Sequence, residues 1–250
     1  MHPYAWPHAW GLLFVVPPLV GAYVVAARLY PPSRVRIAAF SASQVLLVVA
    51  FATPLETIAL HYLLSAHLLQ NVVVAEWAPG LAVFGLAPAF ARELERYAPV
   101  RALTQPLVAL PLWLGTYFAW HIPWIYDRAL ENPRTVLHLE HTTYFVAGAL
   151  MWWPVVHGRW SDGVKAVYLF AAFVLASPLG LLLALLPRPA YAFYAHAPRL
   201  WGIGRLLDQQ IAGLTMAVEQ AVVFFAVFAV YLQRFLRRES IAGAFSETHR

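Results

Sequence analysis

The chain contains no cysteine and only three methionines among its 250 residues. The absence of cysteine excludes disulfide bonds, thiolate metal sites and cysteine nucleophiles. Three methionines also argue against a copper(I) site built from thioether sulfur. Any metal that this protein binds must therefore be held by nitrogen and oxygen atoms.

Charged residues are also scarce. They make up 12% of the chain, against 61% hydrophobic residues, and the mean hydropathy is +0.63. Soluble domains carry about 25% charged residues, so this composition indicates an integral membrane protein. The net charge of +5 comes from basic residues scattered between apolar segments, which form no basic patch. We therefore expect membrane lipid around the protein and no nucleic-acid partner.

The apolar residues fall into segments of about 20 residues, the length that crosses a bilayer as a helix. We predict an all-α, polytopic membrane protein with seven transmembrane helices, which form a single domain over residues 1–236. A polar, frayed tail, 237–250, should follow. The predicted spans are 10–27, 37–53, 58–76, 103–121, 135–156, 164–186 and 209–236.

The orientation follows from the distribution of lysine and arginine between the loops. With the N-terminus outside, the inner loops hold 12 of these residues and the outer loops hold 5. Because positive residues gather on the cytoplasmic side, this ratio favours an external N-terminus and a cytoplasmic C-terminus. Most histidines then fall on or near the outer face.

Three histidines around the start of the fifth span are the main functional lead. His138 and His141 are three residues apart and should project from one helix face, with Glu140 between them on another face. The polar segment 127–134 can turn the chain back and bring His121 beside them. Neutral imidazole is the commonest protein ligand for transition metals, so the pattern predicts a metal site.

The third span carries a second polar stripe, because His67, Gln70 and Asn71 share one helix face. Polar groups in hydrocarbon are costly, so this face should point into the bundle. At a rise of about 1.5 Å per residue, His67 lies roughly 14 Å and His61 roughly 5 Å into the span, and His141 lies roughly 9 Å into the fifth. His67 and His141 can therefore meet if these two spans pack together.

The predicted site accordingly has two groups of residues. The expected metal ligands are His67, His121, His138 and His141, with His61 as a possible ligand at the mouth of the site. The expected polar neighbours are Gln70, Asn71, Asp208 and Glu140. Asp208 precedes an apolar run, so it can cap the seventh helix or orient a metal-binding imidazole.

Two carboxylates lie inside predicted spans. Glu219 is about 16 Å into the seventh span, near the middle of the bilayer, and Glu76 is near the inner end of the third. We expect separate roles for them: Glu219 hydrogen-bonded inside the bundle, and Glu76 directed toward Arg92 or Arg96. A path for protons or cations through both carboxylates is the alternative.

Five short motifs follow one another along the chain. They are Ala66-His67-Leu68-Leu69-Gln70, Trp120-His121-Ile122-Pro123, His138-Leu139-Glu140-His141, Trp152-Trp153-Pro154 and Asp208-Gln209-Gln210-Ile211-Ala212-Gly213. In their order and spacing, and over nearly its whole length, the chain resembles the seven-span CtaG-type cytochrome c oxidase assembly factors. It departs from that pattern at Asn71, where the family commonly has a histidine, and at Glu76 and Glu219, where it is usually apolar or aromatic.

The resemblance implies a role in maturing the copper centres of haem-copper oxidases at the outer face of the membrane. We therefore expect a non-enzymatic assembly factor of a bacterial-type plasma membrane that binds or delivers copper, with zinc as a second possibility. Its expected partner is a haem-copper oxidase subunit or another copper chaperone.

Three other interpretations remain open at this point. One is a membrane haem protein whose iron is held by two histidines. Another is a proton or cation transporter that uses Glu219 and Glu76. The third is an oxidase-binding scaffold that carries no metal.

Overall fold

The structure, a computed structural model, describes residues 2–247, and all the regular elements in this range are helices, as predicted. In chain order they are α1 (Trp10–Leu29), α2 (Arg34–Ala52), α3 (Pro54–His61), α4 (Leu64–Val72), the π-helix η1 (Val73–Trp77), α5 (Ala78–Gly85), α6 (Pro88–Leu94), α7 (Ala98–Leu103), α8 (Pro106–Trp120), α9 (Pro123–Glu131), α10 (Val136–Val156), α11 (Asp162–Leu185), the 3-10 helix η2 (Phe193–His196) and α12 (Arg205–Glu247).

Within the described part of the chain, five helices are long and apolar enough to cross a membrane. They are α1, α2, the continuous helix Leu64–Gly85 formed by α4, η1 and α5, α11, and Arg205–Glu239 of α12. The other two predicted spans correspond to α8, which is apolar but has only 15 residues, and to α10, which has 21 residues and polar first turns. The chain is thus a multi-pass membrane protein.

The third predicted span was placed too early in the sequence. The helix that starts at Pro54 ends at His61, and the backbone N–H groups of Tyr62 and Leu63 both donate to the carbonyl of Ile58. Leu63 is extended, so the spanning helix starts at Leu64. His61 therefore lies outside the span, and His67 lies near its first turn.

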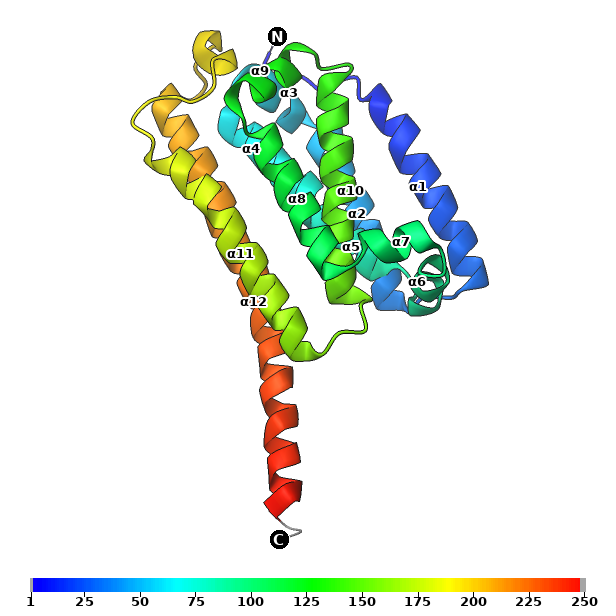
Figure 1. Cartoon of the computed structure of the whole chain (residues 1–250). Coiled ribbons are helices and arrows are strands. Elements are labelled where there is room, and N and C mark those ends of the chain that lie inside the picture. The colour runs from blue at the N-terminus through cyan, green and yellow to red at the C-terminus, as the bar shows by residue number, and fades with distance from the viewer. Residues whose placement is uncertain (1, 248–250) are drawn as a thin grey trace.

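The helices form a bundle with two distinct ends (Figure 1). α3 and α9 lie at the end that also holds the start of α10, here called the α9 end, whereas α6 and α7 lie at the opposite end. α11 and α12 pack side by side on one flank, and α1 stands on the other. Helix α12 continues beyond the bundle to Glu247, so the predicted tail is helical from 237 to 247 and not frayed; residues 248–250 lie outside the described range.

The segment between α11 and α12 contains a short helix. The 3-10 helix η2 is fixed to α9, because the carboxylate of Asp127 accepts hydrogen bonds from the backbone N–H groups of Ala192 (3.0 Å) and Phe193 (2.9 Å). This loop therefore packs over the α9 end of the bundle.

α10 packs very closely against the continuous helix of α4, η1 and α5. A Cβ atom added at Gly148 would lie 2.1 Å from the carbonyl oxygen of Ala75 and 2.7 Å from the ring of Pro79. One turn further on, the indole of Trp152 covers Gly80 and donates to the carbonyl of Glu76 at 2.9 Å. Trp152 is therefore buried between helices.

This contact gives a stability prediction. Alanine normally stabilises a helix interior by about 0.5–1 kcal/mol relative to glycine. In Gly148→Ala, however, the new methyl group meets the backbone of η1, and overpacking of this kind costs about 1–3 kcal/mol. We expect a lower thermal unfolding midpoint in detergent.

Gly115→Ala is the matched control, because a Cβ at Gly115 in α8 would have no neighbour within 4 Å. This variant should unfold at the same temperature as the wild type or slightly above it. Equal midpoints for the two variants would contradict the close helix contact.

Candidate functional site

The centre of the site is a contact between α4 and α10 inside the bundle. The side chains of His67 and Glu140 are both fully buried, and the Nε2 atom of His67 lies 3.8 Å from a carboxylate oxygen of Glu140. The same oxygen accepts a hydrogen bond of 3.0 Å from the side-chain amide of Asn71. Glu140 therefore faces the polar stripe of α4, although the sequence placed it away from the histidines.

His141 extends this contact. Its ring centre lies 6.1 Å from that of His67 and 4.8 Å from that of Phe51 in α2. The predicted meeting of His67 and His141 therefore occurs, with an aromatic ring closing one side.

His121 approaches the same region from the end of α8. Its Nδ1 atom lies 2.8 Å from the carbonyl oxygen of Tyr117 and 3.2 Å from the hydroxyl of Tyr144. The ring of Tyr126 lies near two of these histidines: its centre is 5.3 Å from that of His67 and 6.3 Å from that of His121. His121 is therefore beside the pair, as predicted, and the ring of Tyr126 contacts both His67 and His121.

Several polar atoms of this cluster are buried without a hydrogen-bond partner. They are both ring nitrogens of His67, Nε2 of His121 and of His141, one carboxylate oxygen of Glu140, the side-chain oxygen of Asn71 and the hydroxyl of Tyr126. Unpaired buried polar atoms are costly and rare in folded proteins. Their concentration here marks the cluster as the candidate site.

The cluster is not arranged as a finished metal centre. Within residues 2–247, no group of three or more histidine, aspartate or glutamate side chains lies close enough together to hold a metal ion as it stands. The shortest approach between histidines described above is that of His67 and His141.

Two predicted ligands lie elsewhere. His61, at the end of α3, is exposed, and so is His138 in the first turn of α10. A Cβ atom added at Gly11 of α1 would lie 3.4 Å from the ring of His138. His138 therefore faces α1 and not His67, so the expectation that it shares an inward face with His141 is wrong.

Gln70 and Asp208 support α4 and do not contact the imidazoles. The amide of Gln70 donates to the carbonyl of Ala50 (2.6 Å) and to the carboxylate of Glu56 (2.7 Å). Asp208, at the start of α12, accepts from the backbone N–H groups of Leu64 (2.7 Å) and Ser65 (3.0 Å) and from the Ser65 hydroxyl. Asp208 thus caps α4, not its own helix as the sequence suggested.

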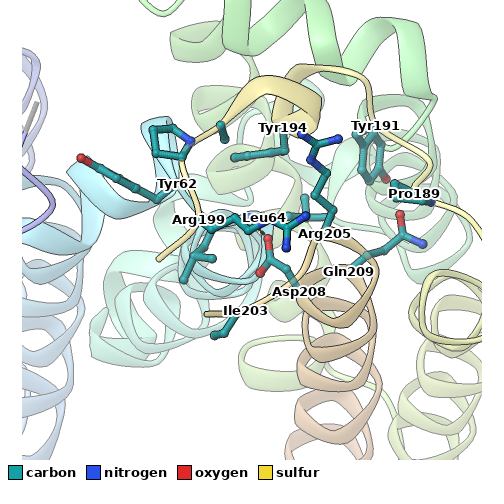
Figure 2. A pocket seen from close by; sticks show the side chains of 13 residues that line it. Tyr62, Leu64, Pro189, Tyr191, Tyr194, Arg199, Ile203, Arg205, Asp208 and Gln209 are labelled. Atoms are coloured by element: carbon teal, nitrogen blue, oxygen red, sulfur yellow. Dashed lines mark hydrogen bonds between the residues drawn. The ribbon is translucent and has the colours of Figure 1, made fainter. Parts of the chain in front are cut away.

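Asp208 also lines a small cavity at the α9 end. Figure 2 shows its carboxylate beside Leu64, with Arg205 and Gln209 from the same helix. The cavity volume is about 30 Å³, enough for one or two water molecules. A larger cavity of about 650 Å³ lies at the opposite end and is lined by residues of α6 and α7, by Thr104 and Gln105 before α8, and by the end of α10 with the residues after it. Neither cavity is lined by the three clustered histidines.

The two intramembrane carboxylates meet, which overturns their predicted separation. Glu76 is fully buried and does not reach Arg92 or Arg96. Its carboxyl accepts from the side-chain amide of Gln220, the residue after Glu219, at 3.1 Å, and the carboxyl of Glu219 accepts from the indole of Trp77, the residue after Glu76.

Three residues at the site were not predicted from the sequence. Tyr126 and Tyr144 contact the histidines, and Glu56 accepts a hydrogen bond from Gln70. One signal was available. Leu137, Glu140 and Tyr144 follow each other at helical spacing, and all three are buried. That stripe places Glu140 and Tyr144 inside the bundle and leaves His138 outside it.

Buried histidines and carboxylates between closely packed apolar helices define this chain as a multi-pass membrane protein with an internal polar site. Such residues inside membrane helices are expensive to bury and mark functional sites. The chain belongs to the cytochrome c oxidase caa3 assembly factor (Caa3_CtaG) family, which matches residues 19–238. Comparisons with curated proteins and with solved structures gave no significant match.

The cap on α4 gives a second prediction. Asp208→Ala leaves the N–H groups of Leu64 and Ser65 without their acceptor, and losing such a cap costs about 0.5–2 kcal/mol. We expect a lower thermal unfolding midpoint. Asp208→Asn keeps one side-chain oxygen and should lose less stability than Asp208→Ala. If Asp208→Ala unfolded at the wild-type temperature, the cap would not contribute to the stability of the folded protein.

Proposed function

We propose that this assembly factor binds a copper ion between His67 and His141 and passes it to an oxidase subunit or to another copper chaperone. Membership in the assembly-factor family suggests a non-enzymatic role connected with an oxidase. Copper is the cargo in this proposal, and the protein supplies the ligands. The observation that carries it is the set of buried, unpaired ring nitrogens on these two histidines.

The distance between the two rings supports a two-ligand site. An imidazole nitrogen binds a transition metal at about 2 Å, which puts its ring centre about 3 Å from the ion. Two imidazoles on opposite sides of one ion therefore have centres about 6 Å apart, and the observed separation is 6.1 Å. Small rotations of the side chains would suffice to aim both nitrogens at one point.

The charges favour a singly charged ion. The Glu140 carboxylate is buried next to His67 and contributes one negative charge. Burying a charge is favourable only when an opposite charge accompanies it, so copper(I) together with Glu140 would leave the site neutral. His121 is the third imidazole that could join the ion if Tyr126 moved. Zinc is the competing metal, since nitrogen and oxygen ligands suit it as well.

In the membrane, we propose that α8 and α10 complete a seven-span arrangement with the N-terminus outside. The distribution of basic residues supports this orientation. The α9 end, and with it the histidine cluster, would then face the extracytoplasmic side of a bacterial-type plasma membrane. Because His67 is buried, a metal ion would reach it only through a movement at this end, where the exposed His61 lies.

Metal analysis of the purified protein tests the site. After loading with copper(I) or zinc and removal of excess metal, we expect the wild type to retain about one copper ion per chain. His141→Ala should lose it, because one of only two close ligands is gone. His138→Ala is the matched control on the same helix and should retain copper as the wild type does.

Equal copper in the wild type and in His141→Ala would remove the proposed site, and so would a specific loss in His138→Ala. Retention of zinc in place of copper would reassign the metal. A Soret band in the untreated protein would show that haem is bound, and the histidines would then be assigned to haem in place of copper.

A complementation experiment tests the role in assembly. When expressed in cells that lack the native protein, the His67→Ala variant should restore little oxidase activity. The His61→Ala variant should restore most of it, because His61 lies outside the cluster. Copper added to the medium should partly rescue His67→Ala if copper delivery is the missing step. Full activity of His67→Ala without added copper would instead favour a scaffold without metal.

A further inference from the structure

The carboxyl groups of Glu76 and Glu219 form a second polar site, deeper in the bundle than the histidine cluster. Glu76 is fully buried in the π-helix η1, and Glu219, on α12, is 8% exposed. One oxygen of Glu76 accepts from Gln220, and one oxygen of Glu219 accepts from the indole N–H of Trp77 at 2.5 Å. The other oxygen of each carboxyl has no N–H or O–H donor.

The hydrogen bonds cross between the two helices: Gln220, next to Glu219, donates to Glu76, and Trp77, next to Glu76, donates to Glu219. The two carboxyl groups are therefore close neighbours in the interior of the bundle. Two ionised carboxylates held this close together in a buried site would repel each other strongly. One proton between them removes the repulsion and supplies a donor for the oxygens that lack one. Pairs of carboxyl groups that share one proton are an established arrangement in proteins.

The surroundings offer no other compensation for two negative charges. Among the described residues, the side chains of Gln220 and Trp77 donate to the pair, and Trp152 donates to the backbone carbonyl of Glu76. Tyr117 of α8 faces Glu76 through its hydroxyl, which accepts from the same Gln220 amide at 2.9 Å. These groups are neutral, and none of them is an arginine, lysine or histidine.

We infer that Glu76 and Glu219 bind one proton between them, and that this proton holds α12 against η1. The site is separate from the histidine cluster and does not depend on the copper proposal. The ligand of this site is a proton. When the proton leaves, the contact between α12 and η1 should weaken.

The position of the pair explains why one contact matters. α11 and α12 pack tightly on each other, because a Cβ atom at Gly213 would lie 2.5 Å from the backbone of α11. This helix pair meets the rest of the bundle at several polar points. They are the Asp208 cap at the α9 end, the carboxyl pair with the bond from Gln220 to Tyr117 in the middle, and the bonds from Tyr168 to the carbonyl of Met151 and from Tyr231 to the carbonyl of Val155. Loss of the shared proton would put two like charges at the middle point.

The consequence has a definite sign. The folded protein holds a proton that the unfolded chain would release at neutral pH, so the folded state binds more protons than the unfolded state. Stability must then fall as the pH rises through the range in which the pair ionises. In Glu219→Gln, the new amide can donate to the Glu76 carboxylate without any shared proton, so this pH dependence should disappear.

Thermal unfolding of the full chain in detergent tests this inference. Each kcal/mol lost lowers the midpoint by about 2–4 °C for a chain of this size, and we expect at least that fall for the wild type between about pH 6 and about pH 9. Glu219→Gln and Glu76→Gln should show a flat profile over the same range. Glu131→Gln, an exposed residue of α9, is the control and should behave as the wild type does.

Infrared spectroscopy of the wild type provides a readout that does not rely on the variants. The carbonyl stretch of a protonated carboxyl should be present at neutral pH, decline at alkaline pH, and change in Glu219→Gln. Absence of this band at neutral pH would overturn the inference. So would a midpoint that falls equally with pH in the wild type and in both glutamine variants, or a wild-type midpoint that depends on sodium and not on pH, which would assign the pair to a metal cation.

Discussion

The structure depends on one close contact, between α10 and the continuous helix of α4, η1 and α5. Gly148 lies against the backbone of Ala75, and this approach sets the register of the two helices along their whole length. Eight residues before each of these positions, the same register brings Glu140 to His67. Without a side chain at position 148 the helices can come close enough for these polar groups to meet; a larger residue would separate them.

The polar groups in the interior are distributed over two levels, and each level uses a different chemistry. At the α9 end, imidazoles with unpaired nitrogens surround one carboxylate, which suits a cation with few ligands. Deeper in the bundle, two carboxyl groups face amide and indole donors, which suits a proton. In an apolar surrounding, each level is stable only if its charges are balanced, so the occupant of each level is restricted by the charge already there.

Much of this arrangement could be predicted from the sequence, because burial of polar residues in a membrane is costly enough to leave a pattern. The stripe of His67 and Asn71 on one face was sufficient to predict an inward orientation, and His141 was correctly expected to meet His67. The assignment failed for His138, since a spacing of three residues does not tell which of two histidines lies on the buried face. Counting from Leu137 through Glu140 to Tyr144 would have given that answer.

Sequence alone determined the membrane environment, the helical class, the family and the types of atom available for metal binding, because these follow from composition and from short motifs. Only the tertiary structure decided which polar residues are partners. The helix break after His61 means that the third span starts at Leu64. Glu76, in the π-helix, lies near Glu219, and Asp208 of α12 caps α4. Each of these depends on how two helices distant in sequence are placed in register. A local pattern cannot encode that placement, because it results from packing over the whole length of both helices.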